Sequence, residues 1–279
     1  MKNKKRLFLA GIWIALAVLV LLLSVMCKNN KSIIDIKVPD YYSLSEFYFD
    51  GDFNEFYRDS YDWYQSIEDK EGVYIVNTSF YDYEVLNGWK ENKVYNSVPD
   101  KAFWYFTVSP SYLKQMGIEI SAKEISDAQN GTRLYLIPDT LSENESEIMI
   151  SFLKEDAIEK ADTSNIQTVF TVKQDVRIIK YTPNKAYFTW PCDRGQAVTD
   201  KAPVIYVCTS ENMKYFENES LISTGLDSYV KFADGDIVRK YTENSIMKKY
   251  NTKFTASSAI YIHAAKSKLT DKGIEKVFK

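Results

Sequence analysis

The sequence predicts an α+β protein in which one N-terminal transmembrane helix is followed by a mixed α/β extracytoplasmic domain. Three observations in the 279-residue chain support this fold class. Residues 7–26 form an uncharged apolar run, later segments alternate apolar and polar residues as strands do, and helix-capping patterns separate those segments. Strands that alternate with helices along a chain indicate an α+β or mixed α/β domain.

The apolar run is long enough to cross a membrane. At about 1.5 Å per helical residue, residues 7–26 reach roughly 30 Å, the thickness of the hydrocarbon core. Four basic residues between positions 2 and 6 precede the run, so the positive-inside rule keeps the N-terminus in the cytoplasm. We therefore predict a single-pass protein of the cell membrane with its C-terminal domain outside.

Two alternatives to an uncleaved anchor concern the end of this run. A cleaved signal peptide has a shorter apolar region and small residues at its cleavage site, whereas Val25 and Met26 stand here. A lipoprotein would carry its lipid on Cys27, which Met26 directly precedes. Both alternatives fit the residues less well than an uncleaved anchor.

The predicted organisation has three parts. Residues 1–27 are the cytoplasmic tip and transmembrane helix, 28–70 are a tether and an amphipathic helix, and 71–279 are the α+β extracytoplasmic domain. Helical spacing of apolar residues within 53–70 predicts a stripe that packs on the domain and an opposite face turned away from it. The stripe contains Phe53, Phe56, Tyr57, Tyr64 and Ile67, and the opposite face contains Asp59, Asp62 and Glu68.

Charge and cysteine content restrict the function of the external part. Four of the 35 basic residues precede the span, which leaves 31 against all 38 acidic residues, a formal charge of −7. An acidic domain is a poor ligand for nucleic acid, so we predict no nucleic-acid partner. Cys192 and Cys208 could form a bridge, but two cysteines are not a disulfide framework. Stability must come from a core, for which 21 Tyr, 15 Phe and 5 Trp provide material.

The first half of the domain is expected to begin with strands. Residues 72–88 and the segment ending at 108 alternate and are rich in strand-forming residues. Ser109 then suits a helix N-cap, Pro110 the first helical position and Gly117 a left-handed C-terminal residue, which predicts a helix over 111–116. A capping box at 121–124 opens a second helix, which Asn-Gly at 130–131 ends.

A strand, a cap and a helix then occur twice. Residues 132–140 predict a strand ended by Pro138, and a capping box at 142–145 opens a helix with Ile148, Met149, Phe152 and Leu153 on its inner side. Residues 204–208 predict another strand, followed by a Thr209 or Ser210 cap and a helix with Met213, Phe216 and Leu221 facing inward. Residues 166–172 and 175–182 are expected to be strands, and 233–236 a turn.

No group of residues predicts catalysis, a cofactor or a metal site. His263 is the single histidine and fits a half-buried strand position, while Cys192 beside Asp193 and Arg194 fits a loop better than a nucleophile. The Asp-Gly-Asp turns at 50–52 and 234–236 lack the ligand spacing of a calcium loop. No glycine-rich loop leads from a strand into a helix, which excludes an ATPase.

Four segments resemble the extracytoplasmic domain of the bacteriocin-associated integral membrane proteins. The segments are VSPSYLKQMGIEIS at 108–121, NGTRLYLIPDTLSENE at 130–145, IIKYTPNKAYFTW at 178–190 and the region 202–232. These proteins are similar to ABC transporter permeases of the FtsX/MacB type, which have one N-terminal span, a large outer domain and further spans. The resemblance runs from about residue 1 to at least residue 240.

The resemblance implies a non-enzymatic part of a bacteriocin export or self-protection system. It implies the membrane, an ABC-type ATPase and a multi-span permease as partners, and a peptide as a candidate ligand. The further spans of the permeases are missing from this sequence, so active transport by this chain alone is not expected. An independent surface peptide-binding or immunity protein is the alternative, and an anchored hydrolase would need a clustered carboxylate or Cys/His site that the sequence does not display.

Overall fold

The computed structural model describes residues 41–48, 52–159, 166–190, 198–199, 202–221, 229–242, 249 and 253–258. The chain divides into two units, Met1–Lys37 and Val38–Lys279, and all described residues belong to the second. The predicted transmembrane helix, the cytoplasmic tip and most of the tether lie outside them. Within the described ranges, no helix combines the length and the apolar character that crossing a membrane requires.

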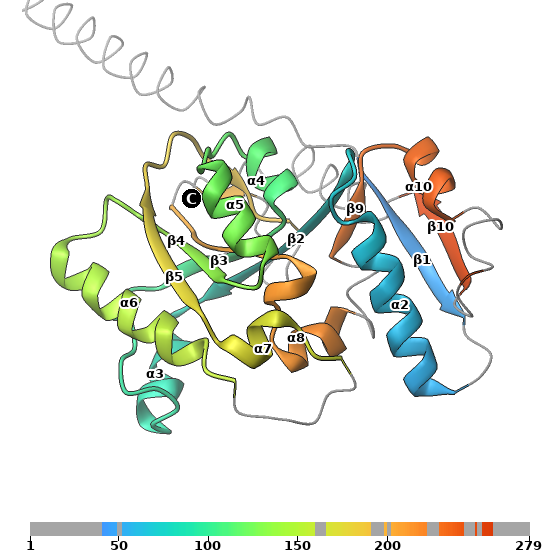
Figure 1. Cartoon of the computed structure of the whole chain (residues 1–279). Helices are drawn as coiled ribbons and strands as arrows, with labels where there is room; N and C mark the ends of the chain where they lie inside the picture. The colour runs from blue at the N-terminus through green and yellow to red at the C-terminus, as the bar shows by residue number, and fades with distance from the viewer. Residues whose placement is uncertain are drawn as a thin grey trace, which may run out of the picture. The chain divides into compact units, whose positions relative to one another are not determined.

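The second unit is built on one mixed sheet whose strands follow the order β10-β1-β9-β2-β3-β8-β4-β5 (Figure 1). Strands β3 and β8 pair in parallel, as do β4 and β5, and the remaining neighbours pair antiparallel. The strands are β1 (Tyr42–Tyr48), β2 (Val73–Tyr81), β3 (Phe103–Val108), β4 (Arg133–Pro138), β5 (Val176–Tyr181), β8 (Val204–Val207), β9 (Val230–Phe232) and β10 (Lys253–Ser258). A separate pair joins β6 (Tyr187–Phe188) to β7 (Val198–Thr199).

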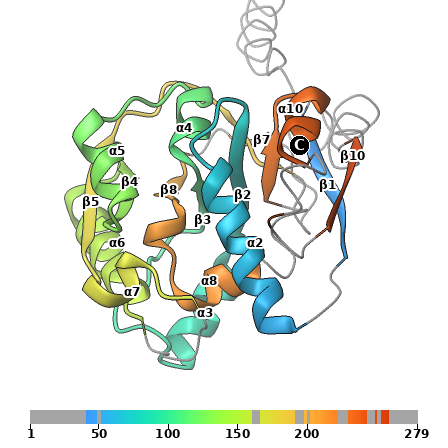
Figure 2. The same cartoon turned by 45° about the vertical axis from the view of Figure 1, so that its right-hand side comes forward.

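Helices connect and cover these strands, which confirms the predicted mixed α/β character (Figure 2). They are α2 (Phe53–Ile67), α3 (Tyr83–Glu91), α4 (Pro110–Gln115), α5 (Ala122–Gln129), α6 (Glu143–Asp156), α7 (Val169–Lys173), the 3₁₀ helix η1 (Ser210–Asn212), α8 (Tyr215–Ser220) and α10 (Gly235–Thr242).

The main core joins helix side chains to alternate residues of the strands. Trp63 and Tyr64 of α2 and Phe152 of α6 belong to the same buried cluster as Ile75 of β2 and Tyr206 of β8. Because side chains of a strand alternate between faces, these strand residues define one covered face of the sheet. Helix α2 follows the predicted aromatic stripe at Phe56, Tyr64 and Ile67, each of which is buried.

The predicted capping residues around α4 are confirmed and have a second role. The Ser109 hydroxyl accepts a hydrogen bond from the Tyr112 amide at 3.3 Å and one from the Ile75 amide of β2 at 3.0 Å. The Ser111 hydroxyl donates to the Val73 carbonyl at 2.8 Å. Gly117 ends the helix with a φ of +72°, the left-handed conformation that glycine adopts without a steric cost. These residues therefore cap α4 and fasten it to β2.

The other predicted caps are also present. Ser121 and Ser142 each form a complete capping box, with Glu124 and Glu145 respectively. The α6 residues Met149, Phe152 and Leu153 are buried as predicted. Strands β3, β4, β5 and β8 lie where the alternating segments placed them.

The strand predicted over residues 72–88 is confirmed only as far as Tyr81, where β2 ends, and the strand predicted over 166–172 is wrong. In both places a cap and tertiary packing outweigh strand propensity. Residues 83–91 form α3, since the Asp82 side chain accepts a hydrogen bond from the Val85 amide and Leu86 is buried in the core. Residues 169–173 form α7, which Thr168 caps through the Thr171 amide. Phe170 on this short helix is fully buried, so the β-branched residues around it follow its packing rather than their own preference.

The described aspartates of the two Asp-Gly-Asp segments include Asp52 and Asp234, and each of these caps the start of a helix. Asp52 accepts hydrogen bonds from the Asn54 and Glu55 amides at the N-terminus of α2. Asp234 accepts one from the Ile237 amide at the start of α10. The predicted turn at 233–236 thus continues into a helix, and Asp50 lies outside the described residues.

Candidate functional site

A cavity of about 200 Å³ lies between the covered face of the sheet and the segment that contains α8. Half-buried polar side chains from the middle of two strands form part of its lining, namely Asn77 and Ser79 of β2 and Thr107 of β3. Tyrosines from three neighbouring strands, Tyr81, Tyr105 and Tyr206, surround them. Met213, Phe216, Leu221 and Tyr229 complete the apolar part of the lining.

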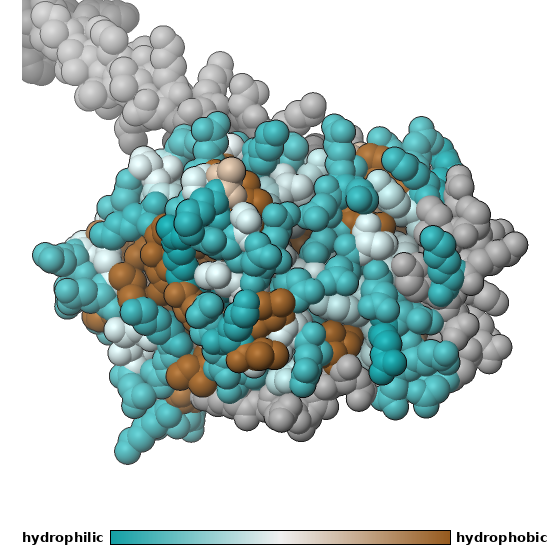
Figure 3. Space-filling view, in the orientation of Figure 1, coloured by the Kyte–Doolittle hydropathy of each residue, from teal (hydrophilic) through white to brown (hydrophobic). Residues whose placement is uncertain are grey.

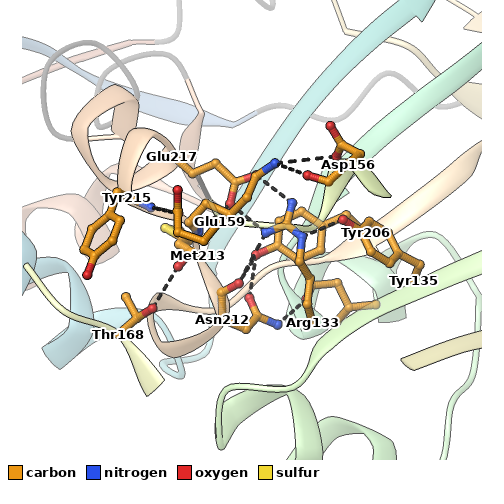
Figure 4. A network of polar contacts seen from close by, with 12 residues as sticks. Arg133, Tyr135, Asp156, Glu159, Thr168, Tyr206, Asn212, Met213, Tyr215 and Glu217 are labelled. Carbon is orange, nitrogen blue, oxygen red and sulfur yellow. Dashed lines mark hydrogen bonds and ion pairs between the residues drawn. The ribbon is translucent and has the colours of Figure 1, made fainter. Parts of the chain in front are cut away.

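An ion pair between β4 and α8 adjoins this cavity (Figure 4). The guanidinium of Arg133 meets both carboxylate oxygens of Glu217, at 2.6 Å and 2.7 Å. Its Nε donates to the Tyr135 hydroxyl at 2.5 Å, and its Cζ lies 3.9 Å from the centre of the Tyr206 ring. Arg133 is fully buried, so the carboxylate supplies the counter-charge that a buried cation requires.

The backbone around η1 completes this network. Asn212 accepts a hydrogen bond from the Tyr206 hydroxyl through its side-chain oxygen at 2.7 Å, and its side-chain amide donates to the Val207 carbonyl at 2.8 Å. The Asn212 carbonyl also accepts from Tyr206 and from Arg133. The short segment between β8 and α8 is therefore fixed by buried polar contacts, which hold α8 over the cavity.

A second pair of opposite charges lines the cavity on the side of α6. The Lys214 ammonium donates to the Asp156 carbonyl at 2.7 Å and lies 3.6 Å from an oxygen of the Asp156 carboxylate. That carboxylate also accepts a hydrogen bond from the Tyr95 hydroxyl at 2.9 Å. The ammonium is 5.1 Å from the centre of the Phe216 ring, within the range of a cation–π contact.

Burial and neighbouring charges shift the pKa values of several ionisable groups that line the cavity. Burial alone would raise the pKa of the Glu217 carboxyl, but the charge of Arg133 outweighs burial and the pKa is lowered. Burial raises the pKa of the Tyr81 hydroxyl to about 12 and raises the pKa of the Cys208 thiol well above its usual value. A neutral thiol is a poor nucleophile, so burial holds the Cys208 thiol in its unreactive form.

Phe216 differs from its predicted position. Met213 and Leu221 face inward as the spacing predicts, but the Phe216 side chain is 57% exposed and lines the cavity. The helix that carries it begins only at Tyr215, because the 3₁₀ helix η1 first occupies Ser210–Asn212 and shifts the helical phase.

The cysteine and histidine residues that the sequence analysis considered for catalysis or metal binding form no site among the residues that the structure describes. Cys27, Cys192 and His263 lie outside the described residues, and Cys208 is a buried free thiol. Across the described ranges, no three His, Cys, Asp or Glu side chains are grouped as metal ligands would be. The Arg133–Glu217 pair was not predicted, and a single arginine at the start of an otherwise apolar strand was its one signal in the sequence.

Comparison of the chain with protein-family models, with curated proteins and with solved structures gives no match.

Proposed function

We propose that this chain is the membrane-anchored extracytoplasmic domain or subunit of an ABC-transporter-permease-like system for bacteriocin export or self-protection. In this proposal the domain is not an enzyme, and the cavity beneath α8 receives one apolar or aromatic side chain of a peptide. An ABC-type ATPase and a multi-span permease are the proposed partners in the membrane. The resemblance of the segments at 108–121, 130–145, 178–190 and 202–232 supports the proposed membrane system, and the cavity supports the binding role.

The observation that carries the binding role is a cavity with an aromatic lining whose charges are already neutralised. Arg133 pairs with Glu217 and Lys214 with Asp156, so a ligand need not bring a charge of its own. The volume of about 200 Å³ is below the roughly 300–1,000 Å³ of pockets that enclose whole drug-sized ligands. A cavity of this size suits a single large side chain, the kind of anchor on which peptide recognition often depends.

Small aromatic molecules that mimic such side chains test this role. We expect indole and p-cresol to bind to the full chain in lipid nanodiscs, as measured by saturation-transfer NMR against empty nanodiscs. Thr107→Phe places a large ring in the cavity from a strand position that accepts phenylalanine well. It is expected to weaken binding of both probes at least tenfold.

Thr107→Val is the matched control, because it keeps the volume and the strand preference while it removes the hydroxyl. This variant is expected to bind the probes with an affinity close to that of the natural chain. If a folded Thr107→Phe protein binds indole as well as the natural chain does, the cavity beneath α8 is not the binding site and the proposed role is wrong.

A further inference from the structure

Strand β5 is the last strand of the sheet order, and Figure 2 shows it at the outer edge. Its inner edge pairs with β4 in a parallel register that runs from Arg133 opposite Val176 to Pro138 opposite Tyr181. The Arg133 amide donates to the Asp175 carbonyl at 2.8 Å, and the Asp139 amide to the Tyr181 carbonyl at 2.9 Å. Both of these β5 acceptors are odd-numbered.

In a parallel ladder, the residues of one strand alternate between bonding to one neighbour and to the other. Since Asp175 and Tyr181 bond to β4, the intervening residues Arg177 and Ile179 do so too. The amides and carbonyls of Val176, Ile178 and Lys180 therefore point away from β4. Among the described residues, no strand pairs with this edge.

A groove of about 600 Å³ adjoins the C-terminal half of the same edge. Its lining includes Ile118, Ile120 and Ile179, which give it an apolar part, and the exposed Glu119. Figure 3 shows apolar residues gathered over the position that β5 occupies in Figure 1. Val172, which precedes β5 in the chain, is 70% exposed.

We propose that β5 binds an extended segment of another polypeptide, which adds to the sheet as an additional strand. The outward amides and carbonyls of Val176, Ile178 and Lys180 have the spacing that only another extended backbone can match. Alternate side chains of the added strand would enter the groove beside Ile179. This site is separate from the cavity beneath α8, and the inference goes beyond the proposed function.

The charged residues of β5 indicate which sequence the added strand would have. Arg177 is already paired, with Asp127 at 2.8 Å and with Glu124 at 3.6 Å. Lys180 is exposed at the outer edge and takes part in none of the ion pairs found among the described residues. The fitting partner is thus a strand with apolar residues on the groove side and an acidic residue opposite Lys180.

A second copy of β5 is a poorer occupant. If two copies of β5 paired antiparallel about Ile178, Ile179 of one copy would lie opposite Arg177 of the other, and Tyr181 opposite Asp175. The groove beside Ile179 would therefore face these two charged residues. Both are charged, and Arg177 is already held by its own helix α5. The apolar part of the groove would then remain unfilled, whereas a free peptide can present an apolar side chain there.

Two synthetic peptides and two variants test the inference on the full chain in nanodiscs. The first peptide is a short sequence of alternating valine and glutamate, and the second is the same sequence with all of its amides methylated, so that neither edge can donate a hydrogen bond. We expect the first peptide to bind in a fluorescence anisotropy titration, and the second to bind at least tenfold more weakly because it cannot complete the ladder.

Lys180→Pro removes an outward amide of β5 without breaking a hydrogen bond to β4, and this variant is expected to bind the first peptide at least tenfold more weakly. Lys180→Ala keeps that amide and is expected to retain most of the affinity.

Hydrogen exchange provides a readout that does not depend on the proline variant being folded. In the natural chain, the bound peptide is expected to protect the amides of Val176, Ile178 and Lys180, whereas those of Arg177 and Ile179 are protected in both states. Absence of binding, equal binding of the methylated peptide, or no added protection at these three amides would overturn the inference. A dimer joined through β5 that Lys180→Pro dissociates would assign the edge to a second copy instead. Thr107→Phe is expected to leave the peptide titration unchanged, which separates this site from the cavity beneath α8.

Discussion

Replacing Glu217 by glutamine is expected to lower the free energy of unfolding by about 3–5 kcal/mol, because the buried Arg133 guanidinium then has no counter-charge. Glutamine has nearly the same shape as glutamate and can still accept one hydrogen bond, so the loss reports the charge rather than the volume. Arg133 is fully buried and Glu217 largely so, with side-chain exposures of 0% and 21%. Denaturant unfolding of the full chain in detergent micelles measures the change.

An exposed pair and a double substitution serve as controls for this result. Lys90 and Asp100 form an ion pair of similar length, 2.7 Å, with side chains 40% and 75% exposed, and Lys90→Met is expected to cost at most about 1 kcal/mol. Replacing Arg133 and Glu217 together by methionine removes both charges and is expected to cost less than Glu217→Gln alone. A loss below about 1 kcal/mol for Glu217→Gln would show that this pair does not hold α8 to the sheet.

Glu68 is expected to make the protein less stable as pH rises from about 4.5 to 7. Its carboxylate accepts a hydrogen bond from the Ser210 amide at 2.7 Å and one from the Ser210 hydroxyl. Burial nevertheless raises the pKa of this carboxyl to about 7, with Asp69 adding to the effect. The folded state then binds a proton that the unfolded state releases, so stability is fully present below the unfolded pKa and is lost as pH rises through 7.

Glu68→Gln is expected to remove this dependence, because glutamine can accept from the Ser210 amide and donate to its hydroxyl without carrying charge. At pH 8 the variant is expected to be more stable than the natural chain by about 1–3 kcal/mol, and near pH 4 the two are expected to be alike. Glu147→Gln, at an exposed position of α6, is the matched control and is expected to change neither value. Equal pH profiles for Glu68→Gln and the natural chain would contradict the account of this contact.

Local signals in the sequence predict the parts of the fold that local interactions determine. The caps at Ser109, Ser121 and Ser142 each join a side chain to an amide three residues later, a distance that the sequence displays directly. Strand β3 was predicted from its own alternation. Helix α3 was missed because Asp82, its N-cap, stands in a segment of strand-forming residues that a periodicity of two describes as well.

The candidate site depends on contacts that no local signal contains. Arg133 and Glu217 are 84 residues apart in the chain, and their pairing arises only when β4 lies beside β8 in the sheet. Glu68 has the spacing of a solvent-facing helix residue. In the folded protein, however, Ser210 of η1 lies against it and donates a hydrogen bond to its carboxylate. Phe216 was expected to face inward because the extra turn of η1, which displaces the helix start, is not visible in the pattern of apolar residues.

The measurement that tests the central claim most directly is labelling of a cysteine beside the cavity on intact cells. The claim is that the cavity beneath α8 faces the outside, and Phe216→Cys provides an exposed thiol there. Cys27 and Cys192 are replaced by serine, and the buried Cys208 reports labelling after denaturation. The account predicts that a membrane-impermeant maleimide labels the cysteine at 216 on intact cells, and that indole slows the reaction. Labelling that occurs only after lysis would contradict it.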